Sequence, residues 1–143
     1  MAEETTMEEV FGEVISSYSR SQAIEDGVLV DVSEMAKQAG IKYPVVLTAG
    51  VYADYVRVPK ALKGLQDESG RLWELLWMYA WAVRSGWIKG TQGTFEVTFL
   101  MWEGKHAGNE RLAPYQKALT LKAVCGPNDD GSPCISIMKV DED

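Results

Sequence analysis

Histidine and cysteine are scarce in this chain, and their scarcity limits its chemistry. The 143 residues include one histidine, His106, and two cysteines, Cys125 and Cys134. A single histidine excludes metal sites built from several histidines, and the cysteines lack the CxxC spacing and second pair typical of structural zinc. The sequence therefore predicts neither a metal nor a cofactor. Two alternatives stay open: a zinc site completed by an aspartate, and a Cys125–His106 nucleophilic pair.

Enzyme motifs are absent as well. No stretch matches the phosphate-binding GxxxxGK[ST] or GxGxxG patterns, the GxSxG nucleophile elbow or the HExxH metal motif. Adjacent acids at Glu25–Asp26 and Asp67–Glu68 are typical of helix ends before they indicate acid–base pairs. The sequence thus favours a protein that is not an enzyme, while leaving enzymatic activity uncertain.

The chain also lacks a long hydrophobic run and a basic start. No apolar stretch reaches the roughly 20 residues of a membrane-spanning helix. The acidic beginning does not resemble a signal peptide. We therefore expect a cytoplasmic protein without membrane contact, and the length suits a single domain over 1–143.

Negative charge is concentrated at the two ends. The net charge is −7, but residues 14–128 hold 11 acidic and 13 basic side chains. Short acidic ends at about 1–7 and 141–143 are expected to be solvating tails, with a charged contact surface as the alternative.

The order of patterns predicts an α+β fold. We expect short helices around 10–15, 19–26, 34–39 (capped by Ser33) and 49–56, with short strands at 28–32 and 43–47. The strongest helix, over 68–86, is expected to begin at Asp67 or Ser69 and to end at Gly86. Strands at 94–102, 117–125 and 134–140 follow. The predicted architecture is a small antiparallel sheet, formed mainly by the C-terminal half and packed against one long Trp-rich helix with several short N-terminal helices.

The tryptophans of the long helix permit two interpretations. Trp73, Trp77 and Trp81 are spaced four apart, and each step overshoots a full turn by about 40°. One interpretation is that sheet and helices cover the whole helix. The other is a contact surface for a partner protein. The buried stripe is expected at Leu72, Leu76, Ala80, Val83 and Trp87, and the contact surface at Met78, Trp81 and Arg84.

A second candidate site lies at the start of an early helix. Tyr18, Arg20 and Ser21 stand where backbone N–H groups can hold an anion. These residues act either as caps and packing groups, or as part of a cleft for a ligand or substrate together with Glu25 or Asp31.

The two cysteines flank an acidic turn, "CGPNDDGSPC" at 125–134. Asp-Asp-Gly between two strand-like runs is typical of a hairpin turn, with Gly131 at positive φ. We expect two free thiols that can face each other across this hairpin and stay reduced in a cytoplasm.

Three separated stretches resemble one family of proteins. They are "YSRSQAIEDGVLVDVSEMAKQAGIKYPVVLT", "DESGRLWELLWM" and "LTLKAVCGPNDDGSPCISIM". The chain from about Phe11 to Asp143 resembles small uncharacterised bacterial proteins described as plasmid-related. The resemblance implies carriage on plasmids or phage-like elements, and it implies no activity and no catalytic residue.

These observations favour an accessory or regulatory protein that binds a host or element-encoded protein. One alternative is the ligand-binding or catalytic cleft around Tyr18 and Arg20. Another is nucleic-acid binding, or acidic mimicry of a nucleic acid. Direct binding would need a basic stripe, which we expect at Arg57, Lys60, Lys63, Arg71, Lys89 and Lys105. The sequence does not predict the oligomeric state.

Overall fold

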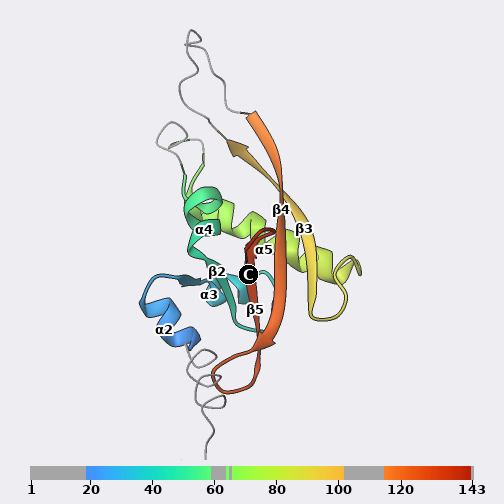
Figure 1. The fold of residues 1–143 in the computed structure, drawn as a ribbon. Helices are drawn as coiled ribbons and strands as arrows, with labels where there is room; N and C mark the ends of the chain where they lie inside the picture. Colours follow the sequence, from blue (N-terminus) through green and yellow to red (C-terminus); the bar gives the residue numbers. More distant parts are fainter. Residues whose placement is uncertain (1–18, 59–63, 65, 102–114, 143) are drawn as a thin grey trace, which may run out of the picture.

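A five-stranded sheet organises the molecule, with strand order β1-β2-β5-β4-β3. The structure, a computed structural model, describes residues 19–58, 64, 66–101 and 115–142 (Figure 1). Strands β3, β4 and β5 form an antiparallel meander, whereas β2 pairs with β5 in parallel. The α+β prediction is confirmed, but the sheet is mixed rather than purely antiparallel. The strands are β1 (Leu29–Asp31), β2 (Val45–Thr48), β3 (Gln92–Met101), β4 (Tyr115–Pro127) and β5 (Pro133–Lys139).

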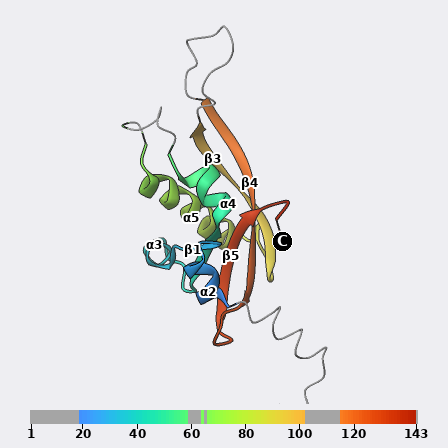
Figure 2. The same cartoon turned by 60° about the vertical axis from the view of Figure 1, so that its left-hand side comes forward.

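The long helix α5 (Glu68–Arg84) crosses one face of this sheet beneath β4 and β3 (Figures 1 and 2). Its start is set locally, because the Asp67 carboxylate accepts a hydrogen bond from the Gly70 N–H. Its end follows from Gly86 at a φ of +79°, as predicted. The shorter elements are α2 (Arg20–Glu25), α3 (Ser33–Gln38), α4 (Ala49–Val51) and the π-helical turn η2 (Tyr52–Val56).

The short helices confirm most of the expected starts. Ser19 caps α2 by accepting from the Gln22 N–H, and Thr48 caps α4 by accepting from the Val51 N–H. Ser33 is the exception, since it lies inside α3 and its hydroxyl donates to Asp31 instead of capping the helix. The helix expected around 10–15 lies outside the described residues.

The main core lies between α5, α3 and the sheet. Alternate residues of the strands point into it, among them Phe95 and Phe99 on β3 and Ile137 on β5. The buried face of α5 differs from the expected stripe: Leu75 and Tyr79 are buried, whereas Val83 and Trp87 are 43% and 67% exposed. Helical period alone locates a stripe only approximately, and the position of the sheet decides which residues it covers.

Arg71 was expected in a basic surface stripe, and this prediction is wrong. Its side chain is 1% exposed, so it cannot belong to a basic surface stripe. The guanidinium donates to Gln66 Oε1 at 2.8 Å and to the Tyr55 carbonyl at 2.9 Å, and lies 5.5 Å from the centre of the Phe99 ring. Burial lowers the pKa of Arg71 from its ordinary value, but hydrogen bonds and the aromatic face compensate part of the desolvation. Lys60, Lys63 and Lys105 of the same stripe lie outside the described residues.

The β4–β5 hairpin confirms the predicted turn and corrects the cysteine geometry. Gly131 has a φ of +84°, and both thiols are free. Cys125 is opposite Ile135, while Cys134 is opposite Gly126. Since neighbouring residues of a strand point to opposite faces of a sheet, the two thiols do not face each other. Cys134 is buried and donates to the Gly126 carbonyl at 3.4 Å.

The C-terminal residues that are described do not form a free tail. The Glu142 carboxylate accepts from the Lys139 N–H at 2.8 Å and from the Thr48 hydroxyl at 2.9 Å. Lys122 Nζ donates to the Glu142 carbonyl at 2.6 Å. The acidic end near 141–143 is therefore held against the sheet at Glu142.

Candidate functional site

Four tryptophans line an open groove between α5 and β3. Trp73, Trp77 and Trp81 follow one another along α5, and Trp87 stands just beyond its end. They are 37%, 45%, 42% and 67% exposed, respectively. The groove has a volume of about 590 Å³. Tryptophan normally buries most of its large apolar surface, so this concentration of exposed rings marks a surface able to bury a partner.

The rings are held by contacts with each other. Trp73 and Trp77 stack with ring centres 6.1 Å apart, and Trp81 meets Trp87 edge to face at 5.1 Å. The Arg84 guanidinium lies 5.9 Å from the centre of the Trp77 ring and donates to the Ala39 carbonyl at 3.3 Å. These contacts order the rings in advance, which lowers the entropy cost of binding.

The opposite wall of the groove is the edge of a strand. Three consecutive residues of β3, Glu96, Val97 and Thr98, line it. Because alternate residues of a strand face opposite ways, a consecutive run can line a groove only along the strand's edge. In the sheet as described, β4 is the one strand that pairs with β3. The outer N–H and C=O groups of β3 are therefore placed to pair with an added strand.

The charged groups of the groove are mainly acidic. Glu74 stands on α5 and Glu96 on β3, so each wall carries one carboxylate. Both side chains are exposed. No lysine or arginine of the described residues lines the groove, and Arg84 beside it donates to the Ala39 carbonyl and lies on Trp77. The groove therefore combines aromatic walls with a local negative charge.

Comparison with known proteins identifies a family. The family of unknown function DUF6573 matches residues 7–143. The chain belongs to this family. No curated protein and no solved structure matches it. Membership of DUF6573 brings no activity with it.

The structure brings two of the three predicted contact residues of this DUF6573 protein into the groove. Met78 and Trp81 line it, and Arg84 stands beside it on Trp77. Trp73 and Trp77 are not among the contact residues predicted from the sequence, because the helical period places them nearer the buried stripe, although their four-residue spacing is visible. The β3 edge is not among them either, since no local pattern in the sequence exists for it.

The backbone N–H groups of Arg20 and Ser21 do bind an anion, but this anion is a carboxylate of the protein itself. Asp129, from the β4–β5 turn, accepts from the Arg20 N–H at 2.8 Å, from the Ser21 N–H at 3.1 Å and from the Ser21 hydroxyl at 2.9 Å. These hydrogen bonds lower the pKa of Asp129. The Arg20 guanidinium donates to the Ser136 hydroxyl and to the Ile135 carbonyl. Arg20 and Ser21 thus join α2 to the hairpin, and Tyr18 lies outside the described residues.

The described residues form neither a metal-binding cluster nor a membrane-spanning helix. Within 19–58, 64, 66–101 and 115–142, no three His, Cys, Asp or Glu side chains come together as a metal site. His106 is outside these ranges. No helix in the described part of the chain has the length and apolar character needed to span a membrane.

Proposed function

We propose that this protein is a non-enzymatic binding protein that holds an extended segment of a partner protein between α5 and β3. One observation carries the proposal: exposed tryptophans form one wall of a groove whose other wall is a strand edge. A strand added to β3 would supply main-chain hydrogen bonds, while its alternate side chains enter the tryptophan-lined space. Both walls are thus used by one extended segment.

The energetics favour this use of the surface. Tryptophan is among the residues that contribute most to protein interfaces, and truncating one such residue commonly costs about 2 kcal/mol of binding energy or more. Trp81 is the central candidate, because it is 42% exposed and lies against Trp87. Trp77 already stacks with Trp73 and lies against the Arg84 guanidinium.

The two carboxylates indicate the chemistry of the partner. Glu74 and Glu96 favour a segment that carries a lysine or arginine next to its apolar side chains. We propose a cytoplasmic accessory or regulatory role on a plasmid or phage-like element. That setting is supported by the sequence resemblance alone.

The test is a selection of linear peptides from a random phage-displayed library on the full-length protein. We expect enriched peptides to alternate apolar residues and to contain a basic residue. Trp81→Ala should weaken their binding about 30-fold, corresponding to about 2 kcal/mol. The matched control is Val140→Ala, which removes an exposed hydrophobic side chain away from the groove and should leave affinity unchanged.

Hydrogen exchange locates the bound peptide. Protection of β3 amides near Glu96–Thr98 on binding is expected if a strand is added to the edge. Equal affinity of wild type and Trp81→Ala, or protection confined to other strands, would refute the proposal. A dimer in light scattering that Trp81→Ala dissociates would also refute it, since the occupant would then be a second copy.

A further inference from the structure

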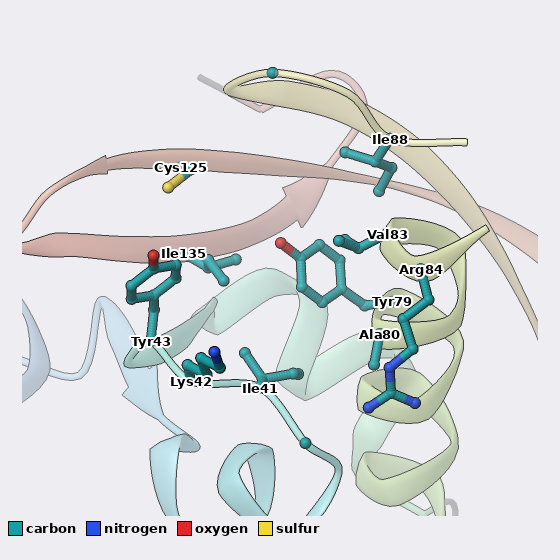
Figure 3. A pocket seen from close by; sticks show the side chains of 12 residues that line it. Ile41, Lys42, Tyr43, Tyr79, Ala80, Val83, Arg84, Ile88, Cys125 and Ile135 are labelled. Atoms are coloured by element: carbon teal, nitrogen blue, oxygen red, sulfur yellow. The ribbon is translucent and has the colours of Figure 1, made fainter. Parts of the chain in front are cut away.

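A second cavity, separate from the tryptophan groove, lies on the adjacent face of α5. It has a volume of about 310 Å³ and is bounded by the segment Gly40–Tyr43, the end of α5, and strands β4 and β5 (Figure 3). Ligand pockets begin at about 300 Å³. A cavity of about 150 Å³ accommodates benzene, so this one suits a body of roughly a dozen non-hydrogen atoms.

The cavity contains the accessible hydroxyl of a tyrosine whose side chain is otherwise mostly buried. Tyr79 is 7% exposed, and its ring is held edge to face against Phe95 with centres 5.5 Å apart. Within the described part of the chain, its hydroxyl makes no hydrogen bond, and Figure 3 shows it pointing into the cavity. Because no buried side-chain oxygen of the described residues lacks a hydrogen-bond partner, this unbonded oxygen must be accessible from the cavity. This hydroxyl is therefore a donor available to a ligand.

The donor stays protonated under ordinary conditions. Burial, and after it the neighbouring Cys125, raise the pKa of Tyr79 to about 12. A neutral phenol can donate its proton to an anionic acceptor without an electrostatic penalty, whereas a phenolate would repel that acceptor.

The remaining lining indicates an anion with an apolar body. Ile41, Val83, Ile88 and Ile135 provide hydrocarbon walls, and the rings of Tyr43 and Tyr79 stand on two sides of the cavity (Figure 3). No carboxylate lines the cavity among the described residues, whereas Lys42 places its ammonium group there. The Arg84 guanidinium points away from the two phenols, consistent with its bond to the Ala39 carbonyl.

We propose that this cavity binds a small aromatic carboxylic acid. The ring lies between Tyr43 and Tyr79 against Ile135, and the carboxylate accepts a hydrogen bond from the Tyr79 hydroxyl and pairs with Lys42. The assignment is independent of the proposed protein-binding groove, because the two sites share no lining residue.

The test uses 4-(trifluoromethyl)benzoate as the probe and its neutral isostere 4-(trifluoromethyl)benzamide as the control ligand. Both are titrated into the full-length protein and followed by fluorine NMR. A ligand of about thirteen non-hydrogen atoms at about 0.3 kcal/mol per atom predicts a Kd near 1 mM or below. The acid should bind at least about tenfold more tightly than the amide, because only the acid pairs with Lys42.

Three variants locate the site. Tyr79→Phe should raise the Kd of the acid about fivefold to tenfold. It should still fold, since the hydroxyl has no bond to lose in the described structure. Lys42→Met should remove most of the preference for the acid over the amide. Lys37→Met is the matched control, because it removes an exposed lysine on α3 that does not line the cavity.

Any one of three results would overturn the proposal that the cavity binds an aromatic acid. These are no saturable binding of the acid up to about 10 mM, equal affinities for acid and amide, or no effect of Tyr79→Phe on a variant shown by circular dichroism to be folded. Loss of binding in Trp81→Ala, with Tyr79→Phe unaffected, would place the probe in the groove instead.

Discussion

Gly40→Ala is expected to destabilise the protein more than the same change at Gly27, although the two glycines have the same local structure. Each follows a short helix at positive φ, +90° at Gly40 and +79° at Gly27. The Gly40 N–H donates to the Lys37 carbonyl at 3.0 Å, and the Ile41 N–H donates to the Ala36 carbonyl at 2.9 Å. The corresponding distances at Gly27 are 3.1 Å and 2.9 Å. This is the Schellman arrangement in both cases.

The difference lies in what surrounds the added methyl group. At Gly27 a Cβ atom would have no neighbour within 4 Å, whereas at Gly40 it would overlap Arg84 Nη2. The left-handed backbone costs alanine about 1 kcal/mol at either site. At Gly40, Arg84 must also leave the Ala39 carbonyl and shift on Trp77. Since Arg84 is exposed, that loss adds about 0.5–1 kcal/mol. We therefore expect about 1 kcal/mol at Gly27 and about 1.5–2 kcal/mol at Gly40.

The assay is urea unfolding followed by far-ultraviolet circular dichroism, applied as a double-mutant cycle with Arg84→Ala. Without the guanidinium, Gly40→Ala should cost no more than Gly27→Ala, so that the coupling energy between positions 40 and 84 is about 0.5–1 kcal/mol. Gly27→Ala should cost the same in both backgrounds. An identical cost of Gly40→Ala with and without Arg84 would refute the reasoning, because the guanidinium would then not be held against this turn.

Four further predictions concern the core, two ionisable groups and the thiols. Leu75→Ala, at a fully buried position, should lower the free energy of unfolding by about 3 kcal/mol in urea, against no more than about 0.5 kcal/mol for the exposed Val140→Ala. Because folding raises the pKa of Tyr79 from 10.0 to about 12, the unfolded state loses the hydroxyl proton at a lower pH than the folded state does. The free energy of unfolding should therefore fall as the pH rises from 10.0 toward about 12. Tyr79→Phe should reduce that alkaline loss in urea titrations, and an unchanged slope would contradict the assignment. The pH dependence of Asp129 has the opposite sign, because its pKa is lowered in the folded state. Its ionised carboxylate stabilises the fold above pH 3.8, and this stabilisation is lost as the pH falls through the pKa of the folded state. Asp129→Asn should therefore speed hydrogen exchange in α2 at neutral pH, and that difference should shrink in acid. In thiol labelling, Cys125 should react before the buried Cys134, whose pKa burial raises, and unfolding should expose both; a single label after unfolding would contradict two free thiols.

The sequence by itself determined the elements whose causes are local. The start of α5 needs only the Asp67 carboxylate three residues before the Gly70 N–H, and its end needs only Gly86 at positive φ. The β4–β5 hairpin likewise follows from alternating apolar residues around Asp-Asp-Gly. Such signals act over a few residues, so they can be read without knowing the partners of the chain.

Tertiary structure alone decided the sites. The parallel pairing of β2 with β5 depends on segments about ninety residues apart, and no local pattern encodes that choice. It is the position of the sheet over α5 that buries Arg71 and leaves Trp77 and Trp81 exposed, although all three occupy the same helix. The groove exists because β3 ends the sheet beside those rings, and the Tyr79 cavity exists because segments distant in the sequence meet around the end of α5. Burial and enclosure are properties of neighbours, and neighbours are set by the packing of the whole chain.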